Sequence, residues 1–162
     1  MKSCRSQITL SFLCLASLFT VITANPVTAN NSIFGKISLS PNSETVKKTV
    51  RGYTGGSYSL SAVSKRDRNR NLCIGFADPK PDHILVLEKD FPKLNIKVNS
   101  GGNDTTLLIV GPDNKTIRCG DDTGRSKDAS IKDINWKAGK YKIWVGSFKA
   151  RSRKNYRLSL QE

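Results

Sequence analysis

Two short stretches of the sequence concentrate positive charge and are the strongest candidates for binding chemistry. They are Lys65-Arg66-Asp67-Arg68-Asn69-Arg70 and Lys149-Ala150-Arg151-Ser152-Arg153-Lys154. Lys and Arg side chains bind phosphate, sulfate and carboxylate groups. The sequence therefore predicts a polyanion-binding surface formed by Lys65, Arg66, Arg68, Arg70, Lys149, Arg151, Arg153 and Lys154. The alternative is that both stretches are solvated loops whose charge serves only solubility.

The charge of the whole chain agrees with a polyanionic partner. Lys and Arg number 27 and Asp and Glu 13, so the formal net charge is +14. The excess of positive charge is unevenly distributed. Residues 30–70 hold eight basic and two acidic residues, and residues 131–162 hold nine basic and two acidic residues. The predicted partner is an acidic polysaccharide or another polyanion of the cell envelope, with another exported protein as the alternative. No motif for RNA or DNA recognition occurs, so we expect no intracellular nucleic acid as partner.

Trp144 and Phe148 are candidates for stacking against a sugar ring. If Tyr141 faces the core of an alternating strand, Lys140, Lys142, Trp144 and Phe148 fall on the opposite face. An aromatic ring beside ammonium groups can hold an acidic sugar. The alternative is that a loop or an N-terminal strand covers Trp144.

An acidic cluster lies between residues 104 and 128, and Asp104, Asp121 and Asp122 are the candidate metal ligands in it. Calcium takes about six to eight oxygen ligands, which carboxylates of adjoining loops can supply. The spacing in Asp121-Asp122-Thr123-Gly124 differs from an EF-hand loop. Hydrogen-bonded turns are the alternative explanation, and no cofactor other than calcium is suggested.

The sequence gives little support to catalysis. His83 is the only histidine, and it follows Asp82 directly. Neighbouring residues of a strand point to opposite faces, so these two side chains are not expected to act together. No Ser lies in a nucleophile-elbow motif. We therefore predict that the protein is not an enzyme.

Residues 1–29 have the pattern of a signal peptide. Lys2 and Arg5 precede an apolar stretch over residues 8–22, which is too short for a typical membrane-spanning helix. Cleavage is expected after Ala29, or alternatively after Ala24, and an uncleaved anchor is the competing interpretation. No second apolar segment follows, so we expect a secreted or periplasmic chain without a transmembrane anchor.

Cleavage at either position would leave two of the four cysteines, Cys73 and Cys119. An even number of cysteines in an exported domain usually indicates a disulfide. We therefore predict a bond between Cys73 and Cys119.

The elements that must position these residues are predicted to be strands. In Lys93-Leu94-Asn95-Ile96-Lys97-Val98-Asn99, apolar and polar residues alternate as in a sheet with one face in water. The other candidate strands are residues 33–39, 45–51, 57–63, 83–87, 105–110, 115–119, 139–147 and 155–160. Several short strands without an amphipathic helix favour an antiparallel sandwich or barrel.

A family resemblance rests on four motifs in order. They are Asp104-Thr105-Thr106-Leu107, Gly111-Pro112-Asp113, Cys119-Gly120-Asp121-Asp122 and Ala138-Gly139-Lys140-Tyr141. This series resembles the bacterial pre-peptidase C-terminal domain, in particular its small secreted variants. The resemblance implies a jelly-roll-like β-sandwich. For the whole fold we expect an antiparallel sandwich of about eight strands, with residues 30–70 as a basic segment with early strands and residues 71–162 as the core similar to the pre-peptidase C-terminal domain. It also implies a non-catalytic module, some relatives of which bind calcium or a polymeric substrate.

These observations together predict a secreted, non-catalytic module that binds an anionic polymer through its basic loops. The alternative is a structural or protein-interaction accessory module, stabilised by calcium, whose positive charge serves only solubility.

Overall fold

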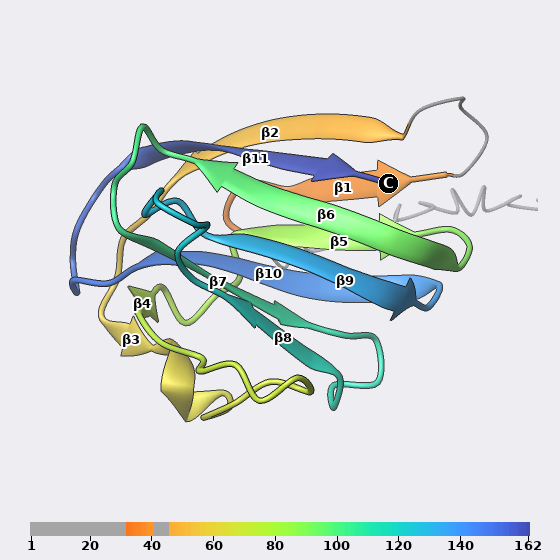
Figure 1. The fold of residues 1–162 in the computed structure, drawn as a ribbon, viewed down its shortest axis with the longest axis horizontal. Coiled ribbons are helices and arrows are strands. Elements are labelled where there is room, and N and C mark those ends of the chain that lie inside the picture. The colour runs from red at the N-terminus through yellow and green to blue at the C-terminus, as the bar shows by residue number, and fades with distance from the viewer. Residues whose placement is uncertain (1–31, 41–45) are drawn as a thin grey trace, which may run out of the picture.

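The computed structural model describes residues 32–40 and 46–162, which form two β-sheets packed face to face (Figure 1). The predicted all-β sandwich is confirmed, and the described residues hold eleven strands instead of about eight. The predicted signal peptide and both cleavage positions lie outside the described residues.

The elements are β1 (Lys36–Leu39), β2 (Lys47–Tyr53), β3 (Tyr58–Ser59), the short 3-10 helix η1 (Leu60–Ala62), β4 (Phe76–Ala77), β5 (His83–Leu87), β6 (Phe91–Asn99), β7 (Thr105–Val110), β8 (Ile117–Gly120), β9 (Ser130–Trp136), β10 (Gly139–Ser147) and β11 (Asn155–Gln161).

The seven-stranded sheet is organised around β10. One edge of β10 pairs first with β5 and then with β4, and the other edge pairs with β7, which in turn pairs with β8. β1 extends the sheet beyond β5 as a parallel neighbour.

The four-stranded sheet has the order β2-β11-β6-β9, and all its pairs are antiparallel. Strands of the predicted basic segment 30–70 contribute to both sheets, because β1 pairs with β5 and β2 pairs with β11. The N-terminal segment and the predicted core are therefore interleaved in one sandwich.

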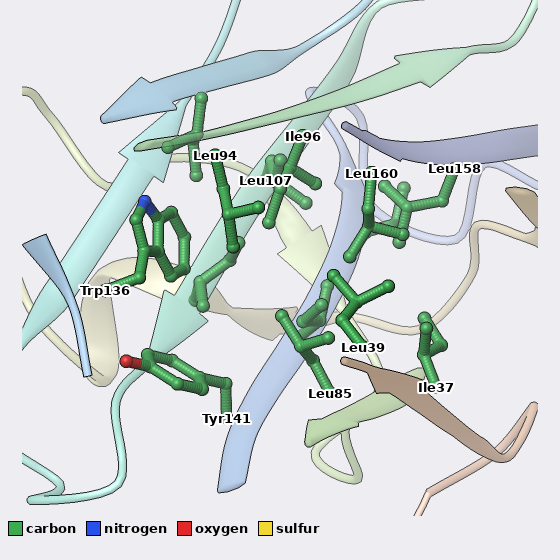
Figure 2. Packing of buried hydrophobic residues seen from close by; sticks show 14 of the residues in the cluster. Ile37, Leu39, Leu85, Leu94, Ile96, Leu107, Trp136, Tyr141, Leu158 and Leu160 are labelled. Carbon is green, nitrogen blue, oxygen red and sulfur yellow. The ribbon is translucent and has the colours of Figure 1, made fainter. Parts of the chain in front are cut away.

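Alternating apolar residues from both sheets fill the space between them (Figure 2). Leu94 and Ile96 of β6 and Leu158 of β11 are fully buried and lie opposite residues such as Leu85 of β5. Trp136 completes one end of this core, where its ring centroid lies 5.4 Å from that of Tyr141. Burial of this apolar area is the main stabilising contribution to the sandwich.

A second apolar cluster lies on the outer face of the seven-stranded sheet, where the segment from η1 to β4 covers it. Leu108, Val110 and Trp144 project outward from β7 and β10 and pack against Leu60 and Cys73 of this segment. The predicted disulfide is confirmed: Cys73 is bonded to Cys119 of β8, with the Cα atoms 5.2 Å apart. Because both faces of β7 are covered, all six of its residues are buried.

Two regions differ from the sequence prediction for physical reasons. β9 is not among the predicted strands, because its pattern is inverted: Asp133 points into the sandwich and Ile134 points to solvent. Residues 57–63 form only the two-residue β3 before the chain turns into η1, which places Leu60 over the sheet. Within residues 32–40 and 46–162, no helix has the length and apolar character needed to cross a membrane.

Candidate functional site

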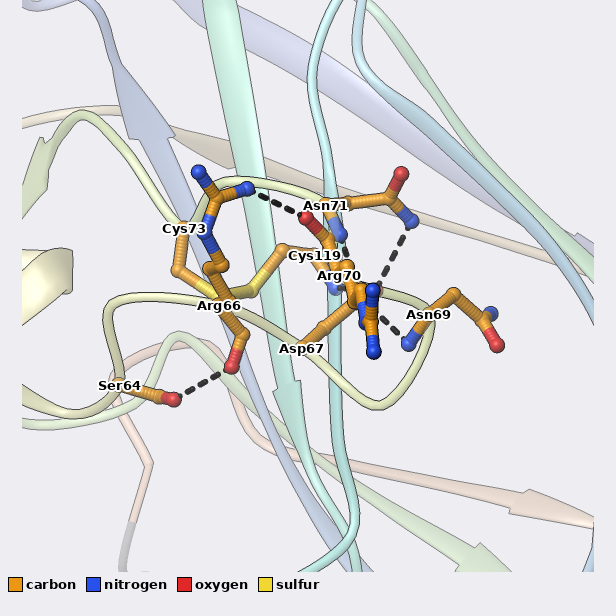
Figure 3. Close-up of a disulfide and its surroundings, with 8 residues drawn as sticks. All are labelled: Ser64, Arg66, Asp67, Asn69, Arg70, Asn71, Cys73 and Cys119. Atoms are coloured by element: carbon orange, nitrogen blue, oxygen red, sulfur yellow. Dashed lines mark hydrogen bonds between the residues drawn. A yellow bond between two sulfur atoms is a disulfide. The ribbon is translucent and has the colours of Figure 1, made fainter.

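The first basic run is a loop folded around the carboxylate of Asp67 (Figure 3). Asp67 is only 9% exposed, and its oxygens accept hydrogen bonds from the backbone N–H groups of Asn69 and Asn71, at 2.8 Å each, and of Cys119, at 3.1 Å. The Cys73–Cys119 disulfide holds the same loop to β8. The only acid of this run is thus turned inward, while the basic side chains remain at the surface.

The four basic side chains of this loop differ in the contacts that they already make within the protein. Lys65 and Arg70 are exposed. The Arg66 guanidinium donates to the Arg70 carbonyl at 2.7 Å, which orders both residues. Arg68 is engaged by Asp133 of β9, with 3.8 Å between nitrogen and oxygen, so part of its charge is already paired.

The second basic run connects β10 to β11 and is held by Thr54. The buried hydroxyl of Thr54 donates to the Ser152 carbonyl at 2.7 Å and accepts from the Lys154 N–H at 3.0 Å. The Arg151 N–H donates to the Gly56 carbonyl at 2.6 Å. This backbone is therefore fixed at two points while Lys149 and Lys154 stay exposed.

Arg153 of the second run stacks on an aromatic ring, with its guanidinium carbon 3.4 Å from the ring centroid of Tyr53 in β2. Among the described residues, no hydrogen bond or ion pair joins the two basic runs. The first run contacts β8 and Asp133, whereas the second contacts the segment from Tyr53 to Gly56. The structure thus places the predicted polyanion residues in two separate loops.

The predicted sugar platform is wrong for Trp144. Its side chain does leave the outer face of β10, but it is only 6% exposed because the segment from η1 to β4 covers it. Its indole N–H points to the Pro79 carbonyl at 3.4 Å. Phe148 is 52% exposed, so of the two predicted stacking residues only this one is open to solvent.

The acidic residues of the middle segment separate into two kinds. Asp113 is a turn residue, since it accepts hydrogen bonds from the Lys115 and Thr116 N–H groups, which lower its pKa to about 2. Asp128 similarly accepts from Ser100 and Gly102. Both therefore have structural partners.

Asp104, Asp121 and Asp122 form the other kind, because each offers a carboxylate oxygen within 4.8 Å of the others. Burial, followed by the charges of Asp122 and Asp104, raises the pKa of Asp121 above its ordinary value. Among the described residues the buried Oδ1 of Asp121 has no hydrogen-bond partner, and Lys127 pairs with Asp104 at 3.5 Å. The donor set therefore fits a hard cation such as calcium.

Asp82 and His83 diverge, as expected for neighbouring residues. Asp82 accepts a hydrogen bond from the Val145 N–H at 2.7 Å, whereas the His83 ring lies 3.0 Å from the Tyr156 hydroxyl. Burial raises the pKa of Asp82 to about 7 and lowers the pKa of His83 to about 4. These groups are buried in the sandwich and not arranged around an open cleft.

Sequence reasoning missed one group of basic residues, on the outer face of the four-stranded sheet. Arg51 of β2 and Arg157 of β11 are direct cross-strand partners there. They line a hollow of about 650 Å³ together with Tyr53, Gly52 and Phe34. The alternation along each strand could have predicted that Arg51 and Arg157 point outward. It could not predict that they are neighbours, because this depends on the register between β2 and β11.

Comparisons with known proteins give a likeness of fold alone. No family model matches the chain, and no curated protein matches it. Among solved structures it is similar to the pre-peptidase C-terminal domain of the collagenase from Bacillus anthracis. The identity is 15%, the similarity covers 77% of this chain and 91% of that one, and the TM-score is 0.47. That domain belongs to the family that the sequence motifs resemble.

Proposed function

We propose that this chain is an exported, non-catalytic β-sandwich module that binds acidic polysaccharide of a cell envelope or matrix through its two basic runs. The observation that carries the proposal is the placement of Asp67. It is the only acid in either run, and its carboxylate is buried against backbone N–H groups. Both runs therefore present positive charge at the surface without an acidic side chain of their own.

The backbone of each run supports the same proposal. Asp67 and the disulfide hold the first run, and Thr54 holds the second at two points. A loop that is ordered before binding loses less conformational entropy on binding. Exposed Lys65, Lys149 and Lys154 at the surface of such loops provide cations for carboxylate or sulfate groups.

A salt titration with charge-reversed variants tests this proposal. The purified protein is titrated with a carboxylated polysaccharide, polygalacturonate, beside neutral dextran. The loop variant reverses four exposed cations, Lys65→Glu, Arg70→Glu, Lys149→Glu and Lys154→Glu. A control variant of equal net charge reverses four exposed lysines of other segments, Lys80→Glu, Lys89→Glu, Lys115→Glu and Lys140→Glu.

The wild type is expected to bind polygalacturonate but not dextran, with affinity falling about tenfold or more between low and physiological salt. The loop variant should bind at least about tenfold more weakly than the control variant, since each lost charge contact removes a salt-dependent contribution. Equal binding by the loop and control variants would show that the loops are not the site. No binding by the wild type at low salt would reject the polysaccharide altogether.

A second candidate function is a structural or protein-interaction accessory module stabilised by calcium. Two exposed apolar side chains favour it, Leu72 at 54% and Phe148 at 52%, and each lies beside a basic run. The unpartnered Oδ1 of Asp121 and the carboxylates of Asp104 and Asp122 are the groups that would hold the ion. Binding to a protein partner through apolar contacts would persist in high salt, unlike binding to a polyanion.

A further inference from the structure

The outer face of the four-stranded sheet carries several basic side chains. Alternation along β2, β11, β6 and β9 turns every second side chain away from the core. Six of these outward residues are basic, and we call this set the basic face: Lys47, Arg51, Lys93, Lys97, Lys132 and Arg157. None of them belongs to the two basic runs.

No acidic side chain points outward from these four strands. Their only acidic residue is Asp133 of β9, which lies on the inward side, 9% exposed. Its carboxylate accepts a hydrogen bond of 2.6 Å from the buried Arg118. The cations of the basic face therefore have no acidic neighbour in their own sheet.

Strand register places the basic side chains in adjoining rows. Arg51 lies opposite Arg157, and Arg157 lies opposite Asn99 on its other side. Along the next rows Lys97 is opposite Ser159 and Ser130, and Asn95 is opposite Lys132. Neighbouring strands are about 4.8 Å apart and outward residues of one strand about 7 Å apart, so the face is a lattice of cations and uncharged polar groups.

The Arg51–Arg157 pair is the part of the basic face that lines a hollow. Like charges placed directly across a ladder repel each other, so the pair is unfavourable unless an anion neutralises it. The two residues line the hollow of about 650 Å³ whose aromatic wall includes Tyr53. Gly52 also lines the hollow, but its missing side chain leaves room on the inner side of the sheet, where a Cβ would lie 2.4 Å from the hydroxyl oxygen of the buried Tyr156.

We infer that the basic face binds a linear acidic polysaccharide, with one carboxylate or sulfate group held between Arg51 and Arg157 in the hollow. The ligand class rests on the proposed function. The cations of this site lie outside the two basic runs, although the second run adjoins the hollow where Arg153 stacks on Tyr53. Arg guanidinium groups bind such planar anions through paired hydrogen bonds. Lys97 and Lys132 then meet further acidic groups along the polymer.

The uncharged residues of the face favour a polysaccharide over a nucleic acid. Amide and hydroxyl side chains, among them Asn95, Asn99, Asn155 and Ser159, alternate with the cations and can hydrogen-bond sugar hydroxyls. Binding of single-stranded nucleic acid relies on aromatic side chains that stack on bases. Tyr53 is the only aromatic residue among the outward positions of the four strands, and Arg153 already covers its ring at 3.4 Å.

The test adds one variant to the polygalacturonate titration. The face variant carries Arg51→Glu, Arg157→Glu, Lys97→Glu and Lys132→Glu, the same change in net charge as the loop and control variants. We expect it to bind at least about tenfold more weakly than the control variant, because each charge contact contributes separately. A single-stranded oligodeoxynucleotide of equal charge serves as competitor and should displace the polysaccharide poorly.

The outcomes separate this inference from the proposed function. Weaker binding by the face variant than by the control variant supports the basic face. Loss in the loop variant alone overturns the basic face and leaves the proposed function standing. Equal loss in the face and control variants, or efficient displacement by the oligodeoxynucleotide, also overturns the inference, and failure of the wild type to bind overturns both.

A measurement on the wild-type protein covers the case in which the face variant does not fold. Lysine acetylation is followed by mass spectrometry with and without polygalacturonate. Lys47, Lys93, Lys97 and Lys132 should be protected, while Lys80, Lys89, Lys115 and Lys140 should react equally in both samples. Unchanged acetylation of the first group in a sample that binds the polymer would overturn the inference.

Discussion

Arg51 and Arg157 are paired directly across the β2–β11 ladder, on a sheet face from which no acidic side chain points outward. Among the described residues neither guanidinium takes part in an ion pair. A sheet normally places opposite charges or uncharged groups at such positions, since like charges directly opposite each other reduce stability. The pair therefore carries a folding cost that an anionic ligand would remove.

Neutralising one member of the pair should stabilise the protein without ligand. Arg157→Gln is expected to raise the free energy of unfolding by about 0.2–1 kcal/mol in low salt, because it removes the cross-strand repulsion. The gain should disappear at high salt, which screens the repulsion. Urea unfolding at both salt concentrations measures this, with Arg125→Gln in an exposed turn as control. Lower stability of Arg157→Gln in low salt would contradict the repulsion.

Removing the disulfide should loosen the cover over Trp144. The double variant Cys73→Ser, Cys119→Ser is expected to lose about 2–4 kcal/mol of unfolding free energy. Because Trp144 packs against this covering segment, its fluorescence should become more accessible to acrylamide. Trp136 lies in the core between the sheets and should stay protected.

The variant Trp144→Phe assigns the fluorescence change. In that background the loss of the disulfide should no longer increase acrylamide quenching, because only the core Trp136 remains. Unchanged quenching in the double cysteine variant with Trp144 present would mean that apolar packing alone holds the cover.

Much of the sandwich could be predicted because burial and alternation coincide in most strands. β5, β7 and β10 have the predicted limits, since their apolar residues face the core in strict alternation or are buried on both faces. β9 could not be predicted, because the buried partner Arg118 allows Asp133 to occupy an inward position. The cover of Trp144 depends on a contact with Leu60, far away in the sequence, which no local pattern reports.

The candidate site was predictable only where its residues are consecutive. The two basic runs are visible as continuous stretches, and the pair Cys73–Cys119 follows from the number of cysteines outside the predicted signal peptide. The basic face is assembled from single residues of four strands, and only the register of those strands makes Arg51 a neighbour of Arg157. The sequence contains the alternation of each strand but not the order of the strands.

Asp82 and His83 should give opposite contributions to the pH dependence of stability. Burial lowers the pKa of His83 from 6.5 to about 4, so between these values the unfolded state binds a proton that the folded state does not. The free energy of unfolding therefore decreases as the pH falls from 6.5 to 4. Burial is the main reason that the pKa of Asp82 rises from 3.8 to about 7, so between these values the folded state keeps a proton that the unfolded state has lost. The free energy of unfolding therefore decreases as the pH rises from 3.8 to 7. The two effects offset each other between pH 4 and 6.5.

Single substitutions uncover each contribution. Relative to the wild type, Asp82→Asn should give an unfolding free energy that rises with pH between 4 and 6.5, with a slope of at most about 1.4 kcal/mol per pH unit. His83→Gln should give the opposite slope, and the double variant should follow the wild type. Urea unfolding at several pH values measures the slopes. Equal signs for the two single variants would refute this assignment.

The buried pair Arg118–Asp133 should respond strongly to loss of one partner. Arg118 is 1% exposed, donates to Asp133 at 2.6 Å and lies 3.9 Å above the Trp136 ring. Asp133→Ala leaves a buried cation without its counter-charge and should cost about 3–5 kcal/mol of unfolding free energy.

Two controls distinguish burial from pairing. The apolar double variant Arg118→Met, Asp133→Leu should recover most of the lost stability, because it leaves no buried charge. Lys137→Gln breaks the exposed ion pair between Lys137 and Asp90, in which the side chains are 75% and 56% exposed, and should change the free energy of unfolding little. A cost for Asp133→Ala no larger than that of Lys137→Gln would show that solvent reaches Arg118.

Calcium should reverse the effect of a substitution at Asp121. Without calcium, Asp121→Asn is expected to raise the melting temperature, because it removes a charge that is partly buried and repelled by Asp122 and Asp104. With calcium, the wild type should gain about 2.7 kcal/mol at a hundredfold excess over Kd, while the variant lacks one carboxylate of the site. The order of the two melting temperatures should therefore invert between chelator and calcium.

A change at the turn residue Asp113 separates the ion site from general acidity. Asp113→Asn should lower the melting temperature by weakening three hydrogen bonds to Lys115 and Thr116, but it should keep the full response to calcium. Lower pH should weaken the calcium response of the wild type, because the proton competes for Asp121, whose pKa is raised by burial and by Asp122. If calcium leaves the wild-type melting temperature unchanged, the three aspartates are a repulsive cluster tolerated by the fold, and the calcium-stabilised accessory module is rejected.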